Sequence, residues 1–293
     1  MKYTNKHNFP SYIQEWLEND SYDYDKNTIS ATRLLQPAKV YALTEQNSEK
    51  LEIDISDIIA SRYGTAIHDS FEKVKLSNCI QEQRLKTKIE GKTLTGKFDI
   101  LHKVNNTLYE LIDIKSTSVW SYIYGSKEED YIKQLSIYRF LAERNGIDVV
   151  EKAKIILVFT DWSSSKARND SSYPQTRIAE KEITLWSTEQ TEKWILERIE
   201  LFKQTLSLKE KDMPECTDEE LWATPDTFAV MKEGRKTAVR VFNNEFEAQK
   251  LACSEQKYFI ERRKGQVKRC KYCLVSGFCE QYKNMKENGR IEE

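Results

Sequence analysis

Asp113 and Lys115 stand two positions apart in the apolar segment LIDIKS, and Asp99 lies upstream in GKFDIL. If both segments are strands, side-chain alternation places Asp113 and Lys115 on one face, and a hairpin brings Asp99 next to Asp113. Two adjacent carboxylates repel each other unless a cation lies between them, and hard oxygen ligands suit Mg²⁺ or Mn²⁺. An ammonium beside the metal could orient or help to deprotonate a water, or neutralise charge on phosphorus. The pattern predicts phosphodiester hydrolysis.

Two further pairs have helical spacing. Gln134 and Tyr138 are four residues apart in QLSIYRFL, so they share a helix face and could reach a phosphate or Lys115. His68 and Glu72 in GTAIHDSFE are likewise one turn apart and are candidate metal ligands, Glu72 the weaker one. Each of the three motifs also has an ordinary structural explanation. An isolated D-x-K is usually a surface ion pair, Tyr138 could be a half-buried tyrosine on a helix surface, and His68 could be a packed or solvated histidine.

The elements that must position these residues follow from periodicity, caps and turn signals. Helices are predicted over 11–19, 29–35, 56–76, 129–145, 187–208 and 244–263, with a short one after Thr217. Strands are predicted over 93–101, 107–116, 153–162 and 177–186, with a turn at 103–106 and a polar loop at 163–175. The helix from Ser187 should begin with a capping box that involves Gln190.

Composition sets the class of protein. The 293 residues are 39% hydrophobic and 32% charged, enough for a large domain with an appendage. No segment has the length and apolarity of a membrane helix, and the N-terminus lacks the apolar core of a secretory signal, so we expect a cytoplasmic protein without a membrane partner. The net charge of -1 gives no general attraction to DNA. Locally, however, a basic segment could contact phosphates; its members are Arg262, Arg263, Lys264, Lys268, Arg269 and Lys271.

Three of the six cysteines, Cys270, Cys273 and Cys279, lie within ten residues. In a reducing compartment such crowding indicates a metal or iron-sulfur site more than a disulfide framework. The spacing supplies three ligands, so the fourth has to be Cys216, Cys253 or Cys79. Thiolates at this spacing suit Zn²⁺ as well as 4Fe-4S, and three unoccupied thiols are the plain alternative.

Together these motifs resemble the PD-(D/E)XK nuclease superfamily, in particular phage-encoded members of the branch that holds RecB-type nuclease domains and CRISPR-associated adaptation exonucleases. GTAIHDSFE is similar to the family's first motif, GKFD to its second, DIK to its third with Asp in place of Glu, and QLSIY to its fourth. SATRLLQP near the N-terminus, and CTDEELW, FAVMKEGRK and CKYCLVSGFC in the tail, extend the resemblance over most of the chain.

The resemblance implies an α/β restriction-endonuclease-like core, a central mixed β-sheet flanked by helices, over residues 1–214, and a helical cysteine-cluster region over 215–293. It implies catalytic roles for Asp99, Asp113, Lys115, Gln134 and Tyr138, and metal ligation by His68, Asp99, Asp113 and the carbonyl of Ile114. In several relatives a four-cysteine cluster binds 4Fe-4S, and one of the four cysteines usually precedes the nuclease core. In this sequence none does. Cys216, in the family-like CTDEELW, is therefore the predicted fourth ligand.

The expected function is therefore that of a Mg²⁺- or Mn²⁺-dependent DNA exonuclease, acting on single- or double-stranded DNA in phage or mobile-element recombination, repair or replication, with recombination or replication proteins as possible partners. Two other hypotheses stay open at this point. One is a non-catalytic DNA-binding or assembly module that keeps the nuclease fold. The other is a zinc-centred protein interaction module confined to the cysteine region.

Overall fold

The computed structural model describes residues 2–19 and 27–291; parts of the predicted N-terminal and C-terminal segments fall outside these ranges. The described chain divides into two compact units. The larger unit comprises Tyr3–Gln36 and Ile53–Lys203, and the smaller unit comprises Met1–Lys2, Pro37–Glu52 and Gln204–Glu293. The predicted division between 214 and 215 stays a prediction.

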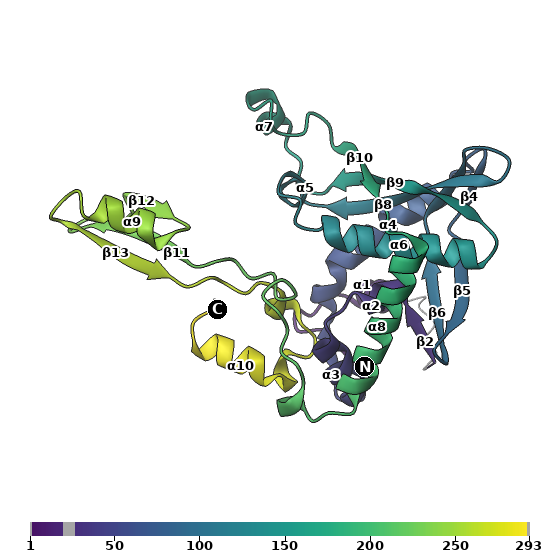
Figure 1. The fold of residues 1–293 in the computed structure, drawn as a ribbon, viewed down its shortest axis with the longest axis horizontal. Helices are drawn as coiled ribbons and strands as arrows, with labels where there is room; N and C mark the ends of the chain where they lie inside the picture. The colour runs from purple at the N-terminus through teal and green to yellow at the C-terminus, as the bar shows by residue number, and fades with distance from the viewer. Residues whose placement is uncertain (1, 20–26, 292–293) are drawn as a thin grey trace. The chain divides into compact units, whose positions relative to one another are not determined.

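The larger unit is built on a five-stranded mixed sheet with the strand order β10-β9-β8-β7-β4 (Figure 1). Its two long central strands, β8 and β9, are parallel, and every other neighbouring pair is antiparallel. The strands are β4 (Cys79–Gln81), β7 (Ile100–Lys103), β8 (Leu108–Thr117), β9 (Asp148–Phe159) and β10 (Ile178–Thr184). Alternate residues of β9, Ala153, Ile155 and Leu157, are fully buried, which agrees with the apolar run that predicted this strand.

A second, three-stranded sheet has the order β2-β6-β5, with β2 (Thr28–Ser30), β5 (Arg84–Ile89) and β6 (Lys92–Lys97). The single strand predicted over 93–101 was wrong, because the chain leaves this sheet after Lys97 and enters the other at Ile100. Phe98 is buried at the crossing and Asp99 follows it, so the change of sheet places Asp99 where two sheets meet. The helix predicted over 29–35 is likewise shorter, because Thr28–Ser30 pairs with β6 first.

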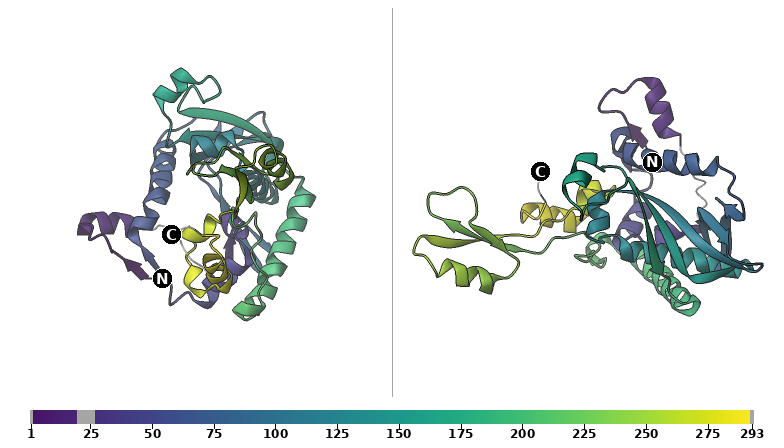
Figure 2. Two further views of the ribbon diagram at one scale, coloured as in Figure 1. Left: turned by 90° about the vertical axis from the view of Figure 1, so that its left-hand side faces the viewer. Right: turned by 90° about the horizontal axis from the view of Figure 1, so that it is seen from above.

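Helix α6 (Glu128–Arg144) contacts β8 and β9 of the five-stranded sheet and β5 and β6 of the three-stranded one. The long green helix in Figures 1 and 2 is α8 (Thr188–Leu206), and its predicted capping box is present: Ser187 N donates to Gln190 Oε1, and Gln190 N donates to Ser187 Oγ. The predicted loop at 163–175 contains one short helix. The remaining elements of the larger unit are α1 (Ser11–Glu18), α2 (Ala31–Leu34), η1 (Ile55–Ile58), α4 (Ile59–Glu72), α5 (Val119–Ile123) and α7 (Ser164–Asn169), with the ribbon of β1 (Lys2–Thr4) and β3 (Glu52–Asp54).

The region 215–293 was predicted to be helical, and this prediction was wrong in part. It holds a three-stranded antiparallel sheet, β12-β11-β13, with α9 packed on it (Figure 1). The helix predicted over 244–263 ends at Ala252, and its second half is β13, because YFIERR is rich in strand-forming residues while no Gly or Pro marks the boundary. The smaller unit comprises α3 (Ala38–Gln46), η2 (Glu210–Asp212), β11 (Thr227–Lys232), β12 (Arg240–Phe242), α9 (Glu245–Ala252), β13 (Tyr258–Arg263), η3 (Arg269–Tyr272), η4 (Ser276–Phe278) and α10 (Glu280–Glu287).

The short helix predicted after Thr217 is a turn, although Thr217 and Glu220 do form the reciprocal hydrogen bonds of a capping box. Within the described part of the chain, no helix combines the length and the apolarity needed to cross a membrane.

Candidate active site

The hairpin of β7 and β8 brings Asp99 and Asp113 to adjacent positions. Ile100 pairs with Ile112, and Asp99 directly precedes β7, so it lies across from Asp113. The carboxylate of Asp99 is held by the backbone: its Oδ2 accepts a hydrogen bond from Ile114 N at 2.6 Å. The turn forms where the sequence predicts it, with Val104 N donating to Leu108 O. The Ile114 N–H thus positions Asp99, and metal ligation by the Ile114 carbonyl stays a prediction.

Asp113 and Lys115 project from the same side of β8. Lys115 Nζ lies 2.7 Å from Asp113 Oδ2, so the ammonium and the carboxylate form an ion pair. Asp113 is 1% exposed, and this burial, reinforced by the charge of Asp99, raises its pKa despite Lys115. Burial lowers the pKa of Lys115, but the carboxylate of Asp113 favours the charged form more strongly, so the pKa is raised overall. The pair therefore places a buried carboxylate in direct contact with an ammonium group.

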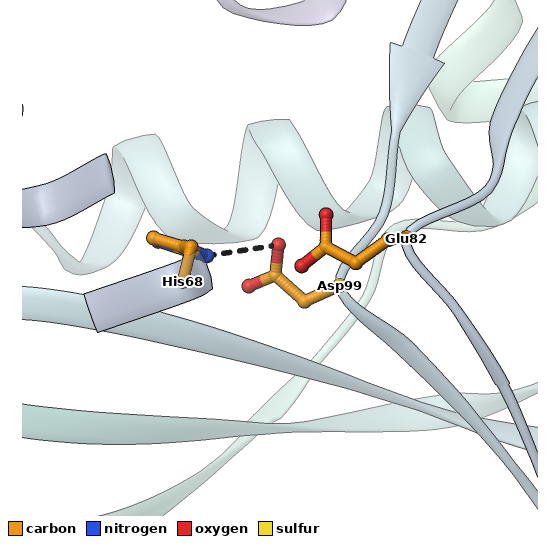
Figure 3. A group of neighbouring side chains, drawn as sticks. All are labelled: His68, Glu82 and Asp99. Atoms are coloured by element: carbon orange, nitrogen blue, oxygen red, sulfur yellow. Dashed lines mark ion pairs between the residues drawn. The ribbon is translucent and has the colours of Figure 1, made fainter. Parts of the chain in front are cut away.

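Two further residues lie next to Asp99, as Figure 3 shows: His68, Glu82 and Asp99 offer ligand atoms that lie within 4.8 Å of one another. His68 Nδ1 is 3.3 Å from Asp99 Oδ1. The hydrogen bond with Asp99 raises the pKa of His68 against the opposing effect of burial. Asp113 does not belong to this group, although its charge acts on His68.

Glu82 was not predicted as a site residue. It lies between β4 and β5, where its N–H donates to the carbonyl of Asp99 at 2.8 Å, so the two backbones are tied together. Its φ of 52° is in the left-handed region, which a non-glycine residue adopts at a cost. Burial raises the pKa of Glu82, and Asp99 adds to the shift while Lys97 opposes it. An acidic residue at position 82 is only a weak sign of a metal ligand, and the sequence gives no sign of the backbone conformation that directs its side chain to the site.

Glu72, the weaker predicted ligand, is not in the group of three. Its carboxylate is 3.8 Å from Lys97 Nζ, while Glu82 lies 2.6 Å from the same ammonium. Lys97 thus contacts both acids, and only Glu82 faces His68 and Asp99. The predicted His68 and Glu72 pair therefore separates: His68 turns towards the site, and Glu82 stands where Glu72 was expected.

Helix α4 carries His68 and crosses β8 closely at Gly64. A Cβ on Gly64 would lie 3.3 Å from Ser116 Oγ, a tight contact that the glycine avoids. None of the residues of α4 is fully buried.

Gln134 and Tyr138 project from α6 towards the Lys115 face, and both are almost fully buried. Gln134 Nε2 donates to Tyr138 OH at 2.7 Å. Burial raises the pKa of Tyr138 well above its usual value, with the charge of Lys115 opposing the shift. Gly96 in GKFD explains the close packing here, because a Cβ at this position would approach the Tyr138 ring to 2.8 Å. Gln134 and Tyr138 are thus two uncharged side chains close to Lys115.

The predicted basic segment is divided among several local partners. Arg262 pairs with Asp226 and Arg263 with Glu261, which offsets their charges. Arg269 donates to the carbonyl of Glu220 and lies over the Trp222 ring, and Lys264 donates to Asn288 O. Lys268 and Lys271 are exposed, and no carboxylate pairs with either in the described structure. DNA contact by this segment stays a prediction.

Cys216, Cys270, Cys273 and Cys279 line one pocket of the smaller unit. Gln281 holds the Cys216 segment, because its side chain accepts from Cys216 N at 2.9 Å and donates to Cys216 O at 2.8 Å. Burial raises the pKa of Cys216 to about 12 and that of Cys270 to about 11. The two other thiols are elsewhere: Cys253 is exposed at the end of α9, and Cys79 belongs to β4 of the larger unit.

Comparisons with known proteins give partial likenesses. No protein-family model and no curated protein matches the chain. The solved structure of SSO0001 is similar, with 20% identity and a TM-score of 0.46 over 64% of this chain and 84% of that one. A phage-related exonuclease from Haemophilus somnus 129PT shares 16% identity, with a TM-score of 0.29 over 67% of this chain and 81% of that one. At these values neither structure assigns an activity to this chain.

Proposed function

We propose that this protein is a metal-dependent deoxyribonuclease whose active site is formed by Asp99, Asp113, Lys115, His68 and Glu82. The observation that carries the proposal is the convergence of His68, Glu82 and Asp99 within 4.8 Å, near the ion pair of the buried Asp113 with Lys115. Burial raises the pKa of Glu82 and that of Asp113, and the charge of Asp99 adds to both shifts, so a cation in front of Asp99 would stabilise the ionised acids. The set also speaks against a non-catalytic module, in which such acids serve no purpose.

The donor set fits a hard divalent ion. Asp99 and Glu82 supply oxygens, and His68 supplies an imidazole nitrogen. The imidazole favours Mn²⁺ over Mg²⁺, because Mg²⁺ prefers an all-oxygen shell. Such an ion, when bound, polarises a phosphate and lowers the pKa of a bound water.

Lys115 is best suited to an electrostatic role. Because Asp113 raises its pKa, Lys115 keeps its proton at neutral pH and is unsuited to act as a general base. A fixed ammonium beside the scissile phosphate stabilises the negative charge that builds up on its oxygens and orients the water. Gln134 and Tyr138, both almost fully buried, add no charge that would offset that of Lys115.

The test is cleavage of end-labelled and internally labelled DNA, single- and double-stranded, with Mn²⁺ or Mg²⁺. We expect metal-dependent cleavage that Asp113→Asn and Lys115→Ala each reduce by about 10²-fold or more, the loss typical for one electrostatic group. Glu72→Gln is the matched control and should retain activity. Equal activity in the wild type and the Asp113→Asn variant would refute the assignment. Release of mononucleotides from ends would support the exonuclease mode.

We further propose that the enzyme acts in recombination, repair or replication of phage or mobile-element DNA.

The four cysteines of the pocket are proposed to bind a 4Fe-4S cluster that has a structural role. All four, Cys216, Cys270, Cys273 and Cys279, line the same pocket as free thiols. Four thiolates around one pocket suit a cubane as well as tetrahedral Zn²⁺. The optical spectrum of anaerobically purified protein distinguishes the two groups.

A further inference from the structure

An exposed aromatic pair lies on α5, directly after the strand that carries Asp113 and Lys115. Trp120 is 44% exposed and Tyr124 is 75% exposed. They are one helical turn apart, and their rings lie nearly parallel, with 6.1 Å between centroids and 20° between planes. We name Trp120 and Tyr124 the aromatic platform. Large aromatic side chains gathered at a surface indicate a binding role more often than isolated ones do.

The start of α5 and the Trp120 ring are supported by packing and hydrogen bonds. Ser118 caps α5 by accepting from Ser121 N at 3.1 Å, and Val119 is fully buried, with its N–H donated to Asp161 Oδ1 at 2.7 Å. Tyr173, itself buried, packs edge-on against the Trp120 ring with 6.3 Å between centroids. A preorganised ring loses little entropy when a ligand stacks on it.

Cations accompany the rings. Lys166 Nζ lies 4.9 Å from the centre of the Trp120 ring and 5.9 Å from that of Tyr173. Among the described residues, no carboxylate lies within ion-pair distance of Lys166, nor of Lys127 near the end of α5. Unpaired ammonium groups beside exposed aromatic rings complement a ligand that has both flat bases and phosphates.

The platform is continuous with the proposed catalytic strand. Thr117 follows Lys115 on the same face of β8, and it lines one small pocket together with Ser121 of α5 and Tyr131 of α6. Lys115 Nζ is 6.0 Å from the Tyr131 ring. At about 3.3 Å per residue, the cap of α5 at Ser118 begins only about 10 Å along the strand from Lys115. A nucleotide on the platform would therefore be a near neighbour of the scissile phosphate.

We propose that the aromatic platform binds unpaired bases of single-stranded DNA by stacking, while Lys166 contacts the adjoining phosphate. This inference rests on the proposed nuclease function and adds a substrate preference to it. Bases in a duplex are already stacked and paired, so only a single strand or a frayed end offers a free face to Trp120. The platform thereby makes this enzyme a nuclease that selects single strands.

The test measures binding separately from cleavage. Fluorescence anisotropy is recorded in EDTA at one salt concentration with a labelled oligothymidylate of about 16 nucleotides and with an abasic oligomer of equal phosphate count. We expect Trp120→Ala to weaken binding of the oligothymidylate by about tenfold or more while changing that of the abasic oligomer by less than about twofold. Trp120→Phe, which keeps a ring, should restore most of the affinity.

Trp16→Ala is the matched control, since Trp16 on α1 is 48% exposed and lies outside the platform. Unchanged binding of the oligothymidylate by Trp120→Ala, or an equal loss for both oligomers, would overturn the proposal; an equal loss would leave only an electrostatic or protein-docking surface. Hydrolysis of bis(p-nitrophenyl) phosphate with Mn²⁺ keeps the two claims separate, because this small ester does not span the platform. If the wild type cleaves neither this ester nor DNA while the anisotropy result holds, the nuclease function fails and the binding platform stands.

Discussion

Substituting alanine for Gly96 tests whether the packing of α6 against β6 positions the active site. The added Cβ would come within 2.8 Å of Leu141 Cδ1 and of Tyr138 Cε1. Carbon atoms in favourable contact lie about 3.5 Å or more apart, so the overlap is about 0.7 Å. Leu141 is fully buried and the Tyr138 hydroxyl is bonded to Gln134, so neither side chain is free to move aside.

The expected cost follows from this overlap. Overpacking a close-fitting core by one methyl group typically destabilises a protein by about 1–3 kcal/mol. For a unit of this size, each kcal/mol lowers Tm by about 2–4 °C, so we expect a decrease of about 2–12 °C. The helix carrying Tyr138 should also shift relative to Lys115, and misplacement of catalytic groups by a fraction of an ångström to 1 Å costs on the order of tenfold to a hundredfold in kcat.

Thermal unfolding followed by circular dichroism, together with cleavage assays below the transition, measures both effects. Gly277→Ala is the matched control, because a Cβ there meets nothing within 4 Å and the glycine has no positive φ. It should leave Tm and activity almost unchanged. If Gly96→Ala unfolds at the wild-type temperature with full activity, the close packing of α6 on β6 is not what holds Tyr138 in place.

Three further predictions concern the metal site and the cysteine pocket. Glu82→Gln should weaken Mn²⁺ binding in calorimetry by about tenfold or more, whereas Glu72→Gln should leave it nearly unchanged, and equal effects would contradict the geometry of the group. Because the pKa of His68 is raised and a metal binds the neutral imidazole, Mn²⁺ affinity should increase with pH, by up to about tenfold per unit, until the pH passes that raised pKa; in His68→Asn this dependence should flatten. Cys216→Ser should abolish the brown absorbance of anaerobically purified protein and lower its Tm, while Cys253→Ser should leave both unchanged.

The sign of the His68 effect on stability can be stated separately for the metal-free protein. Its folded-state pKa lies above 6.5, so the bond to Asp99 contributes fully to stability below pH 6.5, and this contribution is lost as the pH rises through the folded-state value. Metal binding reverses the preference, because it requires the imidazole to lose its proton. Raising the pH should therefore weaken the metal-free fold slightly while strengthening metal binding.

Much of the site could be predicted because it depends on local periodicity. Strand alternation put Asp113 and Lys115 on one face, and a short Asn-containing turn brought Asp99 opposite Asp113. Helical spacing likewise paired Gln134 with Tyr138. These relations extend over a few residues, so the residue types fix them without knowledge of tertiary structure.

The parts that were missed depend on tertiary structure. Glu82 reaches the site through a left-handed backbone conformation and a hydrogen bond to the Asp99 carbonyl, neither of which has a signature in its neighbours. The predicted strand over 93–101 was wrong because its residues are strand formers throughout, and only the packing around Phe98 divides it between two sheets. β13 was missed for a related reason, because the residues after Cys253 contain no glycine or proline to mark the end of α9.

The electrostatics of the site explain why it should need a cation to work. Asp99, Glu82 and Asp113 gather within one region that also holds Lys97 and Lys115, yet the pKa of Glu82 and that of Asp113 are still raised. Burial is the largest cause of both shifts, and the charge of Asp99 adds to each. Asp113 is 1% exposed, so water does little to stabilise its charge. A dication in front of Asp99 would stabilise the ionised forms of both acids. Further lysines would neutralise the same charge but would not polarise a phosphate. The acids whose ionised forms lack full stabilisation in the protein alone are therefore the reason to expect metal-dependent chemistry.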